Sequence, residues 1–284
     1  MTGARSVSGP VRYDPSPTDG PPPEGYERAA IGDAVVVALG AQFDAVRSAL
    51  GAGTLYEYAS RHESSRSLAG RAVAYAAPLP NGEPVVVRHN WHGGFFASLT
   101  GDRFLPPTRA PYELAASRAL AANGVPTPEI VAYVIYRAGP FFRRSDVASR
   151  EIADGRDLGE ILAAGSAPER RAALDAAAML IGDLSGCGAR HHDLNVKNVL
   201  VASAPHGYDR PTAYVLDVDR VEFGRPGDSR ITERNLDRFM RSARKWRELH
   251  SARIEETDLV RVAALVRRVV ASRTSGEWRA RASQ

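Results

Sequence analysis

Lysine is almost absent from this chain of 284 residues, although its formal net charge is +4 at pH 7. Lys197 and Lys245 are the only lysines, and the remaining basic side chains are almost all arginines. Any site before residue 197 that needs a permanent side-chain cation must therefore use arginine.

Cysteine and long apolar runs are scarce as well. Cys187 is the only cysteine, which excludes an intramolecular disulfide and fits a reducing compartment such as the cytoplasm. No apolar run approaches the roughly 18 to 20 residues that span a bilayer. Residues 1–25 are rich in proline and glycine without an apolar signal-peptide core, so they predict a flexible leader. We expect a soluble or peripheral protein.

An apolar fraction of 44% over this length predicts a sizeable core, in one bilobal enzyme or two modest domains.

The most informative segment is His191-His192-Asp193-Leu194-Asn195-Val196-Lys197-Asn198. A His-x-Asp followed by four residues and then an Asn is typical of kinases, in which the Asp accepts the proton of the attacking hydroxyl and the Asn holds Mg²⁺. Asp193 and Asn198 occupy these positions.

A second Mg²⁺ ligand usually follows a short apolar strand, as Asp217 does after Val215 and Leu216. Asp and Asn in loops are also common turn formers. The full pattern predicts an α+β, bilobal protein-kinase-like fold with a small β-rich N-lobe and a larger, mainly helical C-lobe, using ATP and Mg²⁺. We expect the N-lobe to span residues 26–152 and the C-lobe residues 153–284, with a helix over about 168–185.

The cation that binds the nucleotide phosphates is predicted to be Arg88. It ends a β-branched run that follows an Asn81-Gly82 turn. Its acidic partner is predicted to be Glu113, on a helix that Asn123-Gly124 ends. The alternatives are that Arg88 is an exposed strand residue and that Glu113 is a favourable charge in the first turn of a helix. Residues 54–58 and 72–75 read as strands of a hairpin that either covers the phosphates or is ordinary.

The chain resembles the bacterial 3-deoxy-D-manno-octulosonic acid (Kdo) kinases of the lipopolysaccharide kinase group over about residues 55 to 250. The segments that carry the resemblance are VRHNWHGG at 87–94, GVPTP at 124–128, HHDLN at 191–195, LDVDR at 216–220 and NLDR at 235–238. An arginine at the phosphate-binding position of the small lobe, which is Arg88 here, is typical of this family. Asn90, Trp91 and Val218 depart from its usual pattern.

The resemblance implies transfer of the γ-phosphoryl of ATP to the 4-hydroxyl of Kdo on a lipid A precursor. In that reaction Asp193 would orient the hydroxyl, Asn198 and Asp217 would hold Mg²⁺, and Arg88 braced by Glu113 would fix the nucleotide. Lys197 would lie near the transferring phosphoryl group. His191 would support the loop.

Residues 230–284 contain twice as many basic as acidic residues. Arg238, Arg241, Arg244, Lys245 and Arg247 recur near helical spacing, which predicts either a cationic face for anionic lipid at the cytoplasmic face of the inner membrane or a solvated helix. No nucleic-acid module is recognisable, so we expect no nucleic acid. The alternatives are a kinase for another acceptor, such as a heptose, an aminoglycoside or a protein, and a pseudokinase scaffold. A pseudokinase would have lost Asp193, Asn198 and Asp217, which are all present.

Overall fold

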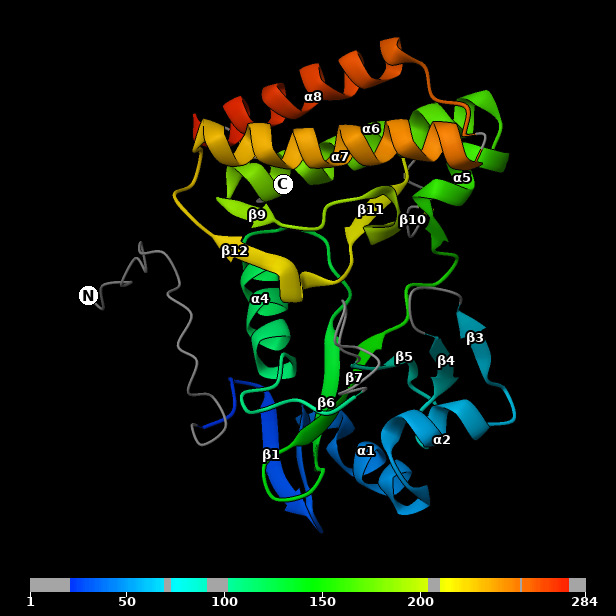
Figure 1. Ribbon diagram of the computed structural model, residues 1–284, viewed down its shortest axis with the longest axis vertical. Helices are drawn as coiled ribbons and strands as arrows, with labels where there is room; N and C mark the ends of the chain where they lie inside the picture. The colour runs from blue at the N-terminus through cyan, green and yellow to red at the C-terminus, as the bar shows by residue number, and fades with distance from the viewer. Residues whose placement is uncertain (1–20, 69–72, 91–101, 204–209, 251, 276–284) are drawn as a thin grey trace, which may run out of the picture. The chain divides into compact units, whose positions relative to one another are not determined.

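The computed structural model describes residues 21–68, 73–90, 102–203, 210–250 and 252–275. Its contacts divide them into two units, here called the β-rich unit and the helical unit (Figure 1). The β-rich unit comprises residues up to 118 and residues 128–153. The helical unit comprises residues 119–127 and those from 154 onward. This combination agrees with the predicted α+β class.

The β-rich unit is built on a seven-stranded antiparallel sheet of order β1-β2-β6-β7-β5-β4-β3. Its strands are β1 Tyr26–Ile31, β2 Ala34–Leu39, β3 Arg66–Leu68, β4 Ala74–Pro78, β5 Pro84–His89, β6 Ile130–Arg137 and β7 Arg143–Arg150. Its helices are α1 Phe43–Ala49, α2 Leu55–Arg61 and α4 Ala110–Ala122, whose last turn groups with the helical unit.

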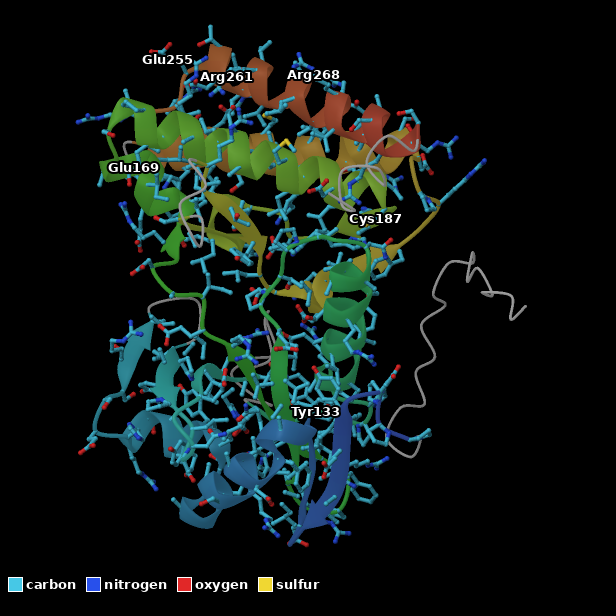
Figure 2. All side chains as sticks on the ribbon, turned by 180° about the vertical axis from the view of Figure 1, so that it is seen from behind. Tyr133, Glu169, Cys187, Glu255, Arg261 and Arg268 are labelled. Atoms are coloured by element: carbon cyan, nitrogen blue, oxygen red, sulfur yellow. The ribbon has the colours of Figure 1, made fainter. Side chains whose placement is uncertain are left out.

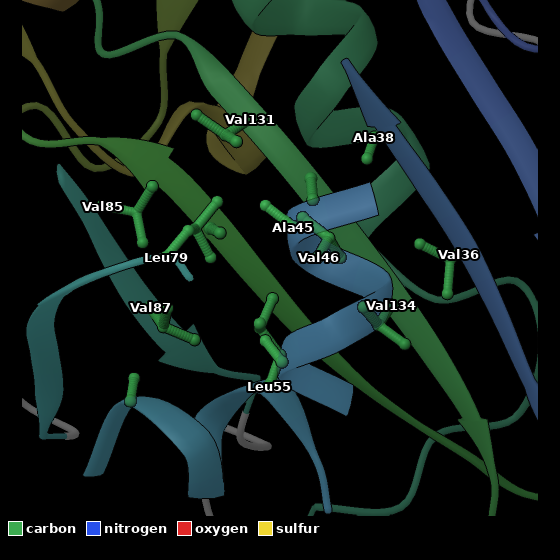
Figure 3. Close-up of a cluster of buried hydrophobic side chains, with 14 of the residues drawn as sticks. Val36, Ala38, Ala45, Val46, Leu55, Leu79, Val85, Val87, Val131 and Val134 are labelled. Atoms are coloured by element: carbon green, nitrogen blue, oxygen red, sulfur yellow. The ribbon is translucent and has the colours of Figure 1, made fainter. Parts of the chain in front are cut away.

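Alternation along the strands gives this sheet two apolar faces. On β2, Val36 and Ala38 join a core cluster with α1 and α2, which includes Val46 and Leu55 (Figure 3). Val37 points to the opposite face, where it joins Leu114 of α4 and other buried residues. A strand places successive side chains on opposite faces, so a sheet covered on both sides needs apolar residues at nearly every position.

The sequence-based prediction of a strand at residues 54–58 is wrong, because Leu55–Arg61 is the helix α2. Thr54 caps it by accepting a hydrogen bond from the backbone N–H of Glu57, whose carboxylate accepts one from the N–H of Thr54. This capping box satisfies two backbone donors that a strand would have to pair elsewhere. The predicted hairpin is formed instead by β3 and β4, and β4 begins at Ala74. Its predicted tip includes residues 69–72, which lie outside the described residues.

Two sequence-predicted turns are confirmed, one in the β-rich unit and one in residues 119–127 of the helical unit. Gly82, with φ of +87°, connects β4 to β5, and Gly124, with φ of +68°, follows α4. Such positive φ angles favour glycine. Residues 1–20 of the predicted leader lie outside the described residues, whereas the chain turns into β1 through a hydrogen bond from Tyr26 N to Pro23 O.

The helical unit contains α5 Leu158–Ala164, α6 Ala167–Gly186, α7 Ser229–His250 and α8 Glu256–Thr274. In Figure 1, α7 and α8 run alongside α6. Its short strands are β8 Arg156–Asp157, β9 Ala189–His191, β10 Val199–Ala202, β11 Thr212–Val215 and β12 Val221–Phe223, with 3-10 turns at Val196–Asn198 and Val218–Arg220. The predicted helix over residues 168–185 is confirmed as α6.

Close packing fixes α6 against α8 at a glycine. A Cβ added to Gly182 would lie 2.5 Å from Cβ of Val269, so the helices approach closely there. Cys187 follows α6, and its thiol donates to the carbonyl of Leu184 (Figure 2).

Candidate active site

The segment with the His-x-Asp-x4-Asn spacing connects β9 to β10. Its His191 is buried, and Nδ1 of the ring lies 3.1 Å from the backbone N of Asp193. A backbone N–H can only donate, so Nδ1 accepts, and Nε2–H donates to the carbonyl of Leu216 at 2.9 Å. Burial lowers the pKa of His191, which favours the neutral ring that these contacts require. His191 thus joins the loop of Asp193 to the residue before Asp217.

Two side-chain amides fix the loop around Asp193. Asn195 Nδ2 and Asn198 Nδ2 both donate to the backbone carbonyl of Asp193, at 3.0 and 2.8 Å. Asn195 Oδ1 accepts from the backbone N–H groups of Lys197 and Asn198. These bonds span only a few residues, so the local sequence can build the loop itself.

Asn198 and Asp217 are brought close by the pairing of β10 with β11. Val199 lies opposite Val215, and the backbone N–H of Leu216 donates to the carbonyl of Asn198 at 2.9 Å. Asp217 has left-handed backbone angles, φ 53° and ψ 48°. Such angles are uncommon outside glycine, asparagine and aspartate, and they often occur at functional positions.

The oxygen atoms of Asn198 and Asp217 fit Mg²⁺ in chemical type. The amide nitrogen of Asn198 is used by the carbonyl of Asp193, which leaves Oδ1 as the ligand atom. Among the described residues no group of three or more His, Cys, Asp and Glu side chains could hold a metal ion. Mg²⁺ commonly binds through one or two protein ligands together with substrate phosphates and waters, so a pair of oxygen ligands suffices.

Helix α7 contributes two side chains to the loop, and the sequence did not predict either contact. Buried Asn235 accepts from the backbone N–H of His191 at 3.1 Å and donates to the carbonyl of Ala189 at 2.9 Å. One turn later, Arg238 forms an ion pair with the carboxylate of Asp193. The sequence signal for these contacts is the three-residue spacing of Asn235 and Arg238, which places both side chains on one side of a helix.

Lys197 is tied to the start of α5. Its Nζ lies 3.1 Å from the Asp157 carboxylate and 5.3 Å from the ring centre of Trp246. Asp157 caps α5 through the N–H groups of Gly159 and Glu160. Burial raises the pKa of Asp157, and Lys197 partly opposes this shift. The predicted place of Lys197 beside the transferring phosphoryl group stays a prediction.

In the β-rich unit, Arg88 of β5 and Glu113 of α4 form an ion pair. The Glu113 side chain is 3% exposed and that of Arg88 29%. The structure thus joins the two residues that the sequence paired, and at this exposure Arg88 is not the exposed strand residue of the alternative. Their role in nucleotide binding stays a prediction.

The residue after Arg88 belongs to a buried polar network that the sequence did not reveal. His89 Nδ1 lies 2.5 Å from Asp146 Oδ1, and its Nε2 lies 3.1 Å from Asp102 Oδ2. The other oxygen of Asp146 accepts from the Tyr136 hydroxyl and from the backbone N–H of Tyr56. Burial alone lowers the pKa of His89, but the two carboxylates outweigh burial and raise it above the ordinary value. The contact of His89 with Asp146 joins β5 to β7, and the raised pKa favours the protonated ring, which can donate to both carboxylates.

Comparison with known proteins identifies the family. The model of the lipopolysaccharide kinase (Kdo/WaaP) family matches residues 59–268, which include Arg88, Glu113 and the whole loop from His191 to Asp217. The chain belongs to this family. Its membership indicates a kinase and confirms the resemblance and the kinase-like fold class that the motifs predicted.

Similar members of the lipopolysaccharide kinase family include two 3-deoxy-D-manno-octulosonic acid kinases. The one from Stenotrophomonas maltophilia (strain R551-3) is 31% identical over 198 residues, covering 68% of this chain and 74% of the relative. The one from Vibrio parahaemolyticus serotype O3:K6 (strain RIMD 2210633) is 27% identical over 190 residues, covering 66% and 75%. A solved structure of WaaP in complex with acyl carrier protein is similar at 19% identity and a TM-score of 0.47, covering 83% of this chain and 93% of that one.

Proposed function

We propose that this protein transfers the γ-phosphoryl group of ATP to the 4-hydroxyl of a Kdo residue on a lipid A precursor. The observation that supports the proposal is that Asp193 and Asn198 lie in one hydrogen-bonded loop between β9 and β10, and that Asp217 closely follows β11, which pairs with β10. The acceptor follows from the Kdo kinases among the relatives.

Asp193 accepts the proton of the acceptor hydroxyl in this mechanism. Its backbone is held on both sides, by His191 Nδ1 at the N–H and by two amides at the carbonyl, so the carboxylate projects from a fixed point. Phosphoryl transfer depends mainly on positioning and charge neutralisation, which a rigid loop provides.

Asn198 and Asp217 would hold Mg²⁺, which neutralises phosphate charge when it is bound. Arg88 binds the nucleotide phosphates, and buried Glu113 keeps its guanidinium from turning away. Lys197 adds positive charge at the end of the loop, where Asp157 limits its movement.

The face of α7 that carries Arg238 supports an anionic lipid partner. Five cations follow one another at spacings of four, four, three and four residues, which places them on a single helix face. They are Arg230, Arg234, Arg238, Arg241 and Lys245. Within the described part of the chain, four of the five form no ion pair, the exception being Arg238. Arg244 and Arg247, which the sequence grouped with this face, pair instead with Glu256.

We infer that this stripe meets anionic headgroups or lipid A phosphates, with the protein peripheral at the cytoplasmic face of the inner membrane. No helix in the described residues is long and apolar enough to cross a bilayer. Reversing Arg241 and Lys245 to Glu should abolish cosedimentation with vesicles that contain phosphatidylglycerol. The matched control reverses two exposed arginines, Arg171 on α6 and Arg268 on α8, the second of which is labelled in Figure 2. Equal losses in both double variants would reject a specific lipid face.

The acceptor hydroxyl is tested by NMR of the product formed from Kdo-bearing lipid A precursor and Mg-ATP. The proposal expects new phosphorus coupling at the carbon that bears the 4-hydroxyl, and no product from Asp193→Asn. The control Asp33→Asn changes an exposed aspartate in the β-rich unit and should leave the product unchanged. Phosphate on another hydroxyl would correct the regiochemistry, whereas phosphate on a different acceptor would reject the sugar.

A further inference from the structure

The contact between Arg238 and Asp193 places a permanent cation against the proposed proton acceptor. Arg238 lies one helical turn after Asn235, whose side chain binds the backbone of both Ala189 and His191. The helix therefore delivers the guanidinium to a fixed place beside the catalytic loop. Both residues lie in the helical unit, so this geometry is defined within one part of the molecule.

Asp193 does not use all the hydrogen-bonding capacity of Arg238. A guanidinium carries five N–H donors, and the contact with Asp193 engages the terminal Nη2. Its Nε is buried and has no hydrogen-bond partner among the described residues. The side chain as a whole is 43% exposed, so the rest of the group can be reached from outside.

An anion that arrives together with the hydroxyl can bind the exposed N–H groups of Arg238. Any hydroxyl that donates its proton to Asp193 lies within hydrogen-bond distance of that carboxylate. Other groups of the same sugar are only a few bonds from that hydroxyl, and Arg238 pairs with the same carboxylate. The sugar named in the relatives is an acid, and its carboxylate matches the planar fork of a guanidinium.

We propose that Arg238 binds the carboxylate of the acceptor sugar and so positions the ring against Asp193. This assignment rests on the proposed function and names the chemical feature by which the site selects its acceptor. Arg238 acts as a positioning and specificity residue. Without acceptor it pairs with Asp193, and with acceptor bound it shares its donors between Asp193 and the sugar carboxylate.

The test compares two acceptors in two proteins. One acceptor is the natural Kdo-bearing precursor, and the other has the sugar carboxylate converted to its neutral methyl ester with all hydroxyls intact. The proteins are wild type and Arg238→Met, which keeps the apolar stem without the charge. Hydrogen bonds to a charged group correspond to roughly 10- to 100-fold in kcat/KM, so wild type should lose that factor on the ester.

Arg238→Met should lose a similar factor on the natural acceptor and little more on the ester, because one interaction is removed in both cases. Arg238→Lys should retain part of the preference for the charged acceptor. Multiplicative losses in Arg238→Met would overturn the assignment and leave the proposed function standing. No transfer by wild type to the natural acceptor would overturn the proposed function and this assignment with it.

Two further arms distinguish the sugar carboxylate from the lipid A phosphates and from a general effect of losing an arginine on α7. Arg244→Met is the matched control, since Arg244 is on the same helix, is 44% exposed and also pairs with a carboxylate, that of Glu256. It should keep the wild-type preference between the two acceptors. The second arm uses a precursor whose lipid A phosphates have been removed. If the cost of Arg238→Met disappears on that precursor, Arg238 binds phosphate and the assignment is wrong. Mg-ATP affinity and thermal unfolding of each variant confirm that it is folded.

Discussion

The ion pair between Arg88 and Glu113 leads to the most detailed prediction, the replacement Arg88→Ala. Glu113 is only 3% exposed, so the variant would keep a carboxylate in a site largely closed to water. Breaking a buried pair by removing one partner costs about 3 to 5 kcal/mol. An exposed pair such as Arg47 with Asp44, whose side chains are 62% and 86% exposed, contributes at most about 1 kcal/mol. Arg47→Ala is therefore the matched control.

The same pair allows stability and nucleotide binding to be separated. Replacing both partners, with Arg88→Met and Glu113→Leu, removes both charges of the pair, and such replacements are often neutral or stabilising. We expect this double variant to unfold near the wild-type denaturant concentration but to bind Mg-ATP much more weakly, because no phosphate ligand remains at β5.

The assay is urea unfolding followed by far-UV circular dichroism, with Mg-ATP titration by calorimetry on the same preparations. Two results would refute the reasoning. Unfolding of Arg88→Ala at the wild-type midpoint would show that Glu113 is not isolated from water. Wild-type Mg-ATP affinity in the double variant would show that Arg88 does not hold the phosphates.

The other predictions concern the catalytic carboxylate, a buried histidine and a helix contact. Asp193→Asn should lower turnover about a hundredfold or more while Mg-ATP affinity stays near wild type, as single-turnover kinetics and calorimetry can show. Because the pKa of His89 is raised in the fold, its protonation stabilises the folded protein. This stabilisation is fully present below the ordinary imidazole pKa near 6.5 and is lost as pH rises through the folded pKa. The free energy of unfolding in urea should therefore fall toward alkaline pH more steeply in wild type than in His89→Gln. Gly182→Ala should destabilise the helical unit by about 1 to 3 kcal/mol through overlap with Val269, measured by thermal unfolding.

Each of these predictions has an outcome that contradicts it. Near-wild-type turnover of Asp193→Asn would remove the proton-acceptor role. A wild-type stability that rises with pH relative to His89→Gln would show that the ring is neutral between its two carboxylates. For the helix contact, Gly51→Ala is the control, since a Cβ there meets nothing within 4 Å. Equal stability of the two alanine variants would show that α6 and α8 adjust without cost.

The parts of the site that sequence reasoning located are those in which local bonds build the structure. His191, Asp193 and Asn198 lie within eight residues, and their mutual hydrogen bonds follow from their spacing. Arg88 and Glu113 were paired because a strand and a following helix carried opposite charges in a chain without early lysines. Arg238 lies 45 residues from Asp193, and no local pattern states that the two side chains meet.

Three features of the structure were mispredicted or missed for identifiable reasons. Residues 54–58 contain threonine and two tyrosines, which are common in strands, but the capping box of Thr54 and Glu57 favours a helix there. Strands β1 and β2 were not predicted, because the short apolar run of β2 resembles a helix segment as much as a strand. The network of His89, Asp102 and Asp146 joins three separate segments, and only the folded sheet brings them together.

Transfer of labelled γ-phosphate from Mg-ATP to Kdo-bearing lipid A precursor tests the central claim most directly. The account predicts label in the wild-type reaction with the Kdo-bearing acceptor, and none with a Kdo-free precursor or with Asp193→Asn. Equal labelling of the two precursors, or undiminished labelling by Asp193→Asn, would contradict it.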